Sequence, residues 1–211
     1  NTADTTLDEI ISMMVGRVIY EEPKHHSNVP EGAPVVLEVK NLLSTQVNNV
    51  SFTLRKGEIL GIAGLMGAGR TELARLIFGA DKRISGEILI NGLPVSISTP
   101  RDSVSTGIGY LSEDRKQFGL CLGLSVANNV ALPTLDLFSR GLVVDDRRIR
   151  STSNEYKGRI DIKTPTVDTP AISLSGGNQQ KVVISKWLVR NSDILIFDEP
   201  TRGIDVGAKS E

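Results

Sequence analysis

A glycine-rich segment in the first half of the chain holds residues whose types and spacing could bind phosphate. Residues 64–71 read Gly-Leu-Met-Gly-Ala-Gly-Arg-Thr. An apolar run at 59–63 precedes them and predicts a strand, and a helical pattern from Glu72 to Phe78, closed by Gly79, follows them. At such a strand–loop–helix junction, backbone N–H groups and the positive end of the helix can wrap around phosphate. The segment fits the phosphate-loop spacing GxxxxGK(S/T), with Arg70 in the place of the lysine.

The last two residues of this loop determine what it could do to a bound nucleotide. Lysine would reach the outer phosphates as a compact point charge, whereas arginine is a longer, planar donor, so we expect nucleotide binding with impaired turnover. The Thr71 hydroxyl is expected to bind Mg²⁺. Taken alone, the segment is equally well interpreted as a tight turn without a ligand. The residues predicted to bind the nucleotide here are Gly64, Gly67, Ala68, Gly69, Arg70, Thr71 and Glu72.

Two adjacent carboxylates follow an apolar run near the end of the chain. Residues 194–197 read Ile-Leu-Ile-Phe and predict a buried strand, and Asp198 and Glu199 come directly after it. The carboxyl ends of such strands are where α/β sheets bind ligands. We expect Asp198 to hold Mg²⁺, directly or through water, and Glu199 to polarise the water that attacks the outermost phosphate. Glu199 is therefore the predicted catalytic base.

A serine and two glycines open a second predicted helix. Ser175, Gly176 and Gly177 precede an amphipathic pattern over residues 178–189. The serine hydroxyl, the exposed backbone N–H groups and the helix dipole would together favour an anion at this end. An ordinary capped helix is the alternative interpretation.

These motifs, in this order, resemble those of ATP-binding cassette (ABC) ATPases, whose phosphate loop, LSGGQ signature and acidic strand end they match. The resemblance implies that ATP is the nucleotide and that Ser175, Gly176 and Gly177 contact the γ-phosphate held by an opposite cassette. It places Asp205 in the D-loop, which links the two sites of a cassette pair. It also places Glu113 at the Q-loop glutamine, where a carboxylate could approach the metal.

Two stretches resemble one branch of the family. Residues 112–116 (Ser-Glu-Asp-Arg-Lys) and 198–209 look like the second cassettes of ribose, xylose or allose importers, and residues 13–17 look like the tail of a first cassette. The resemblance implies an ATP-hydrolysing subunit at the cytoplasmic face of the bacterial membrane. Its implied partners are the first cassette of the same polypeptide, a transmembrane sugar permease and, indirectly, a periplasmic or extracellular sugar-binding protein.

The chain also departs from the family pattern. No aromatic residue lies between Val39 and Val50, where many cassettes stack a ring on adenine. The chain stops at Glu211, before the place expected for the switch histidine, so we expect no hydrolysis from this piece alone. Together with Arg70, these departures suggest an asymmetric ATPase. This half would give an intact signature to the first cassette's nucleotide, while its own site turns over slowly.

Two other functions fit part of the pattern. A soluble ABC ATPase of DNA repair or translation would share the motifs, but the importer-like stretches argue against it. A catalytically degenerate nucleotide-binding or dimerisation half would explain Arg70 and the missing aromatic residue, but the retained Glu199 argues against a complete loss of activity.

The elements that must position these residues predict an α/β fold. We expect a P-loop NTPase core of the ABC type, with an antiparallel β portion near 84–97 and a helical subdomain over about 120–169. Asn91-Gly92 within the β portion is a strong hairpin signal. The expected organisation is the tail of a preceding cassette at 1–20, a linker at 21–34 and a cassette at 35–211 that is truncated at its C-terminus.

Composition narrows the remaining possibilities. A length of 211 residues with 39% hydrophobic and 23% charged residues suits one main globular domain. No apolar run approaches the roughly 20 residues of a membrane-spanning helix, and the formal net charge of -1 does not favour nucleic-acid binding. Cys121 is the single cysteine and cannot form an internal disulfide. His25 and His26 lie in the predicted linker, where a solvated loop is favoured over a metal site.

Overall fold

The computed structural model describes residue 13 and residues 29–204. Apart from residue 13, the predicted cassette tail at 1–20 lies outside the described residues, as do most of the linker at 21–34 and Asp205. The strands are β1 (Val35–Leu43), β2 (Val50–Arg55), β3 (Ser85–Ile90), β4 (Leu93–Val95), β5 (Ile108–Leu111), β6 (Ser139–Arg140), β7 (Val143–Val144) and β8 (Ile194–Phe197). The helices are α2 (Arg70–Ile77), α3 (Pro100–Ser105), α4 (Val126–Ala131), α5 (Asp146–Arg159) and α6 (Gly176–Arg190), with short helical turns η1 (Arg115–Gly119), η2 (Leu132–Phe138) and η3 (Ala171–Ser173).

An antiparallel sheet forms one part of the molecule. Its strand order is β2-β1-β3-β4, and each neighbouring pair is antiparallel. Asn91 and Gly92 join β3 to β4 with φ angles of 51° and 77°. Positive φ at both central residues is what a two-residue hairpin with the favoured twist requires. The antiparallel portion and its Asn-Gly turn are therefore confirmed.

A parallel pair of strands positions the acidic residues. β5 pairs with β8 from Ile108 opposite Ile194 to Leu111 opposite Phe197. β8 matches the strand predicted at residues 194–197. On β5, Ile108 and Leu111 are fully buried. Because parallel strands end at the same edge of a sheet, the residues after Leu111 and those after Phe197 emerge side by side.

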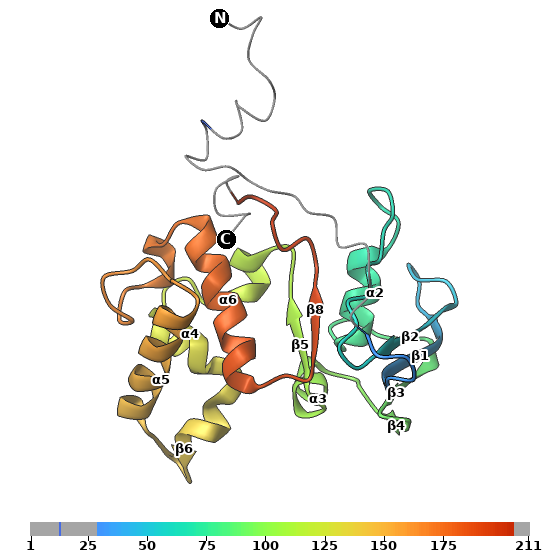
Figure 1. Cartoon of the computed structure of the whole chain (residues 1–211), viewed down its shortest axis with the longest axis horizontal. Helices are drawn as coiled ribbons and strands as arrows, with labels where there is room; N and C mark the ends of the chain where they lie inside the picture. Colours follow the sequence, from blue (N-terminus) through green and yellow to red (C-terminus); the bar gives the residue numbers. More distant parts are fainter. Residues whose placement is uncertain (1–12, 14–28, 205–211) are drawn as a thin grey trace, which may run out of the picture.

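The helices α4, α5 and α6 gather on one side of β5 and β8, and α2 with the antiparallel sheet lies on the other (Figure 1). α6 begins two residues before the predicted helix at 178–189. The segment 120–169 holds α4, η2 and α5 together with a small β6–β7 hairpin that the sequence analysis did not anticipate. No helix in the described part of the chain is long and apolar enough to cross a membrane.

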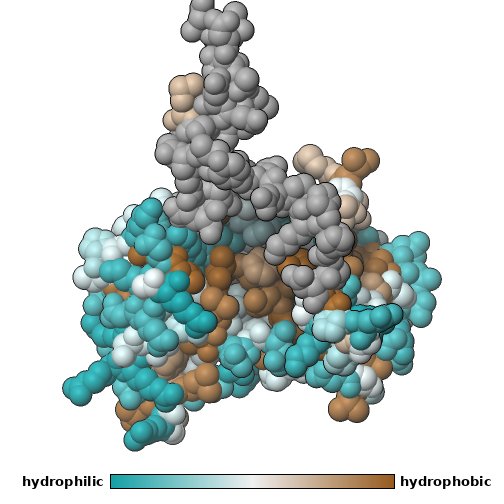
Figure 2. All heavy atoms as spheres, viewed as in Figure 1, coloured by the Kyte–Doolittle hydropathy of each residue, from teal (hydrophilic) through white to brown (hydrophobic). Residues whose placement is uncertain are grey.

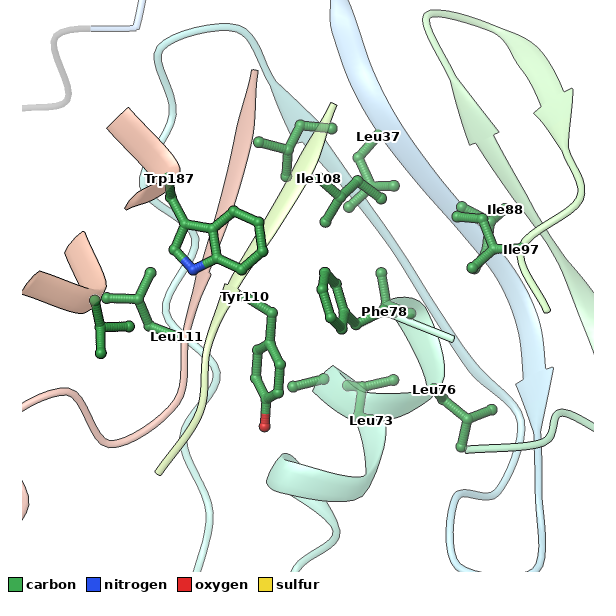
Figure 3. Close-up of a cluster of buried hydrophobic side chains, with 14 of the residues drawn as sticks. Leu37, Leu73, Leu76, Phe78, Ile88, Ile97, Ile108, Tyr110, Leu111 and Trp187 are labelled. Atoms are coloured by element: carbon green, nitrogen blue, oxygen red, sulfur yellow. The ribbon is translucent and has the colours of Figure 1, made fainter. Parts of the chain in front are cut away.

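Aromatic side chains join these parts in one core (Figure 3). Phe78, at the end of α2, lies with its ring centroid 5.3 Å from that of Tyr110 on β5. The Phe78 ring also packs edge-on against Trp187 on α6, with the two ring centroids 6.0 Å apart. Trp187 is 5% exposed and is thus part of the core. Figure 2 shows hydrophobic atoms gathered in the hollow between the two sides of the molecule.

The strand predicted at residues 59–63 is not formed, and that expectation was wrong. Residues 58–65 have no regular secondary structure, and Ile59 is 96% exposed. A cavity of about 540 Å³ separates these residues from β8. Within the described residues β8 pairs with β5 alone, so the apolar run at 59–63 has no neighbouring strand to pair with. Hydrophobicity favours burial, but a strand needs neighbouring backbone to satisfy its N–H and C=O groups.

Candidate functional site

The glycine loop leads into a helix whose first turn lacks a capping side chain. Gly69 occupies the N-cap position of α2 in a left-handed conformation, with φ of 82°, and provides no side-chain hydrogen bond. The helices α3, α4, α5 and α6 begin instead with Thr99, Ser125, Asp145 and Ser175, whose side chains accept from the first turn. The first N–H groups of α2 are thus available to an anion. A Cβ at Gly64 would lie 2.9 Å from that of Ala68, so the loop also requires glycine there.

The three predicted metal ligands lie together. The Thr71 hydroxyl lies 3.1 Å from Oδ1 of Asp198 and 3.4 Å from Oε2 of Glu113. These residues come from the start of α2 and from the ends of β8 and β5, which the parallel pairing brings to one edge. A hydroxyl and carboxylate oxygens are the hard ligands that Mg²⁺ prefers, and Mg²⁺ usually takes few protein ligands and completes its shell with phosphate and water. The residues present therefore fit Mg²⁺.

Asp198 is held by a residue that the sequence analysis missed. Asp198 is 7% exposed, and the Tyr110 hydroxyl donates to its Oδ2 at 2.9 Å. Burial and this hydrogen bond to the carboxylate raise the pKa of Tyr110, so the phenol remains a donor. Both oxygens of Asp198 thus have a defined partner. One signal was available in the sequence, because a tyrosine inside an otherwise apolar buried strand needs a partner for its hydroxyl.

Replacing Tyr110 by phenylalanine is expected to weaken the Mg²⁺-dependent part of ATP binding about tenfold. Residues that orient a metal ligand typically contribute effects of that size. The measurement is ATP affinity as a function of Mg²⁺ concentration. Tyr156→Phe is the matched control, since it removes a hydroxyl that donates to the Leu188 carbonyl away from the site. Equal effects of both variants would contradict this role for Tyr110.

Arg70 and Glu199 form an ion pair across the site. Nη1 of Arg70 lies 3.0 Å from Oε1 of Glu199, and both side chains are partly exposed. Glu199 has a φ of 45°, a left-handed conformation that costs a residue with a side chain and that is found at functional positions. The arginine that stands in the place of the expected lysine is therefore paired with the predicted base. A bound phosphate would compete with Glu199 for this guanidinium.

A second ion pair joins Arg202 to Glu113. The carboxylates of Glu113, Asp198 and Glu199 thus share one edge with the cations of Arg70 and Arg202. Carboxylate oxygens are among the hard ligands that Mg²⁺ prefers, so this edge offers ligands to a divalent cation.

The remaining predicted residues lie outside this group. Ser175 caps α6 by accepting from Asn178, at 3.5 Å from its backbone N and 2.8 Å from Nδ2. Gly176, at the start of α6, lies against Arg115 and the Gly203 carbonyl, and Gln179 accepts from Arg115. Gly177 is buried in the same first turn. The hydrogen bond from Arg75 to Asp81 is the main cause of the raised pKa of Arg75. Glu72, in the first turn of α2, adds a small contribution to the same pKa.

Known proteins share both the sequence and the architecture. Over 211 residues the chain is 56% identical to the "Putative ribose/galactose/methyl galactoside import ATP-binding protein 2" of Burkholderia cenocepacia (strain HI2424), covering 99% of this chain and 41% of that protein. It is 51% identical over 210 residues to the "Ribose import ATP-binding protein RbsA" of Clostridium perfringens (strain 13 / Type A), covering 99% of this chain and 42% of that protein. The chain thus spans about two fifths of these relatives.

A solved structure shares the fold. It is the dimeric post-hydrolysis state of an ATP-binding cassette bound to ADP and Pi, with a TM-score of 0.66 and 24% identity, covering 82% of this chain and 78% of that one. Residues 47–202, which include most of the site described above, match the family described as ABC transporter. The chain belongs to the ABC transporter family.

Proposed function

We propose that this chain binds ATP with Mg²⁺ and takes part in coupling ATP hydrolysis to the import of a monosaccharide through a membrane permease. One observation carries the proposal. The phosphate loop and the acidic strand ends meet at the Thr71 hydroxyl, which lies within hydrogen-bonding distance of Asp198 and Glu113. The names of the relatives, which are import ATP-binding proteins for ribose and related sugars, support the substrate class.

In this proposal each element has one role. Residues 64–69 and the first turn of α2 bind the phosphates through backbone N–H groups, and Arg70 adds a guanidinium. Thr71 and Asp198 would hold Mg²⁺, with Glu113 close by, and the bound ion would supply positive charge next to the phosphates. Glu199 accepts the proton of the attacking water once Arg70 has turned to the nucleotide.

The proposal extends to an asymmetric pair of cassettes. The Arg70–Glu199 ion pair supports slow turnover at this site, because the base is engaged by the residue that replaces lysine. The start of α6, with Ser175, would serve a nucleotide held by the first cassette of the same polypeptide. The chain's coverage of about two fifths of its relatives is consistent with that arrangement. In this organisation residues 35–211 form the second cassette, with a helical subdomain at about 120–169.

The proposed location is the cytoplasmic face of the bacterial membrane, through contact with the permease. The proposed partners also include a periplasmic or extracellular sugar-binding protein that delivers the sugar. Sugar specificity would reside in the permease and the binding protein.

Sugar uptake tests this function directly. Cells that contain the full-length protein, its permease and its binding protein are expected to accumulate labelled ribose or a related monosaccharide in an ATP-dependent way. Matched cells lacking only the ATP-binding protein should not. The protein is also expected to co-purify with a polytopic membrane protein. Absence of uptake, together with retention of the protein on DNA or ribosomes at moderate salt, would contradict the proposal.

A further inference from the structure

Arg115 joins two segments that lie far apart in the sequence. Its Nη1 donates to the carbonyl oxygen of Arg202 at 3.0 Å, and its Nη2 to that of Gly203 at 3.3 Å. Its Nε lies 3.4 Å from Oε1 of Gln179. Gln179 belongs to the first turns of α6, whereas the two carbonyl groups follow β8 and Glu199. One guanidinium therefore spans the start of α6 and the turn after the acidic strand end.

The groups at each end of this connection are themselves held in place. Gln179 is 4% exposed, and its Nε2 donates to the Ala171 carbonyl at 3.0 Å, which fixes the orientation of the amide. On the other side, Asp114 accepts from the backbone N of Lys116 and of Gln117, each at 3.0 Å, and so orders the turn that carries Arg115. Arg115 thus connects ordered groups rather than free side chains.

Gly176 leaves the space that the guanidinium occupies. A Cβ at this position would lie 2.7 Å from Nη2 of Arg115 and 3.1 Å from the carbonyl oxygen of Gly203. The first residue of α6, the guanidinium and the turn after β8 therefore meet in a single contact. A planar fork with several donors can satisfy these acceptors together, which a lysine ammonium cannot.

We propose that Arg115 is a positioning residue that holds the phosphate-facing start of α6 at a fixed distance from the acidic end of β8. The inference rests on the proposed function, because that function gives catalytic importance to the start of α6 and to the acidic end of β8. Among the described residues, Arg115 makes no hydrogen bond or ion pair with the phosphate loop. It also makes none with Thr71, Asp198 or Glu199. Its effect on turnover therefore passes through the geometry of Ser175, Gly176 and Gly177. A misplacement of about 1 Å can slow an enzyme by two orders of magnitude.

Two measurements on the full-length protein in its membrane assembly test this role. Arg115→Ala is expected to lower kcat for ATP hydrolysis about tenfold or more, while KM for MgATP changes less than about twofold. Amide hydrogen exchange should become faster in residues 176–180 and in residues 201–204 together. Lys116→Ala is the matched control, since it removes the neighbouring exposed cation and should leave both measurements at the wild-type values.

Arg115→Lys provides a second variant that keeps the charge. It is expected to recover only a minor part of kcat and of the exchange protection. One ammonium group would replace a planar guanidinium that donates to three separate acceptors. Unchanged exchange in either segment of Arg115→Ala, or equal effects of Lys116→Ala, would overturn the inference. A wild-type protein without ATP hydrolysis, but with the predicted exchange pattern in Arg115→Ala, would refute the proposed function and leave the positioning role standing.

Discussion

Replacing Ser175 by aspartate is expected to lower total ATP hydrolysis of the full-length protein about a hundredfold. Aspartate is as good an N-cap as serine, so α6 should still begin at Gly176. Its carboxylate, however, would face the phosphate that this helix start is proposed to contact, and like charges in close contact cost several kcal/mol. The measurement is steady-state phosphate release in the membrane assembly. The effect would fall on the nucleotide of the first cassette.

Two further variants show whether the charge and the asymmetry are responsible. Ser175→Asn keeps the cap without the charge and is expected to retain most of the activity. Glu199→Gln should lower total hydrolysis by less than about half, because the site of this chain contributes little turnover, and Glu155→Gln on α5 serves as its control. If Glu199→Gln instead reduced hydrolysis as strongly as Ser175→Asp, the two sites would contribute equally and the asymmetric account would be wrong.

Replacing Arg70 by alanine is expected to weaken MgATP binding at this site by about tenfold to a hundredfold. The guanidinium is the one side-chain cation that the loop at 64–71 carries, and a hydrogen bond to a charged group is worth about 1.5–3 kcal/mol. Loss of the Arg70–Glu199 pair on its own would matter less, since partly exposed ion pairs contribute at most about 1 kcal/mol. Equilibrium titration with ATP gives the affinity. Arg147→Ala, which removes an exposed arginine of α5, is expected to bind like the wild type.

Local patterns predicted the elements that carry the site. Helical spacing and a capping serine located α6, an apolar run bounded by polar residues located β8, and the Asn-Gly pair located the β3–β4 turn. In each case the determining interactions lie within a few residues of one another. The same is true of the glycines at 64–69, whose conformation follows from the turn they make.

Contacts between distant residues could not be predicted in this way. Tyr110 and Asp198 are 88 positions apart, and Arg115 and Gly203 are also 88 apart. Neither pair leaves a periodic signal in the sequence. The pairing of β5 with β8, which brings these segments together, forms only in the folded sheet. The wrong strand at residues 59–63 has the same origin. Its apolar residues satisfied the local rule, but no neighbouring strand of the described chain pairs with them.

Calorimetric titration of ATP into the protein, with and without Mg²⁺, tests most directly whether residues 64–71 and Asp198 form a nucleotide site. The account predicts binding that strengthens with Mg²⁺ and that Arg70→Ala weakens by at least about tenfold. Binding that is indifferent to both Mg²⁺ and Arg70, or no binding at all, would contradict it.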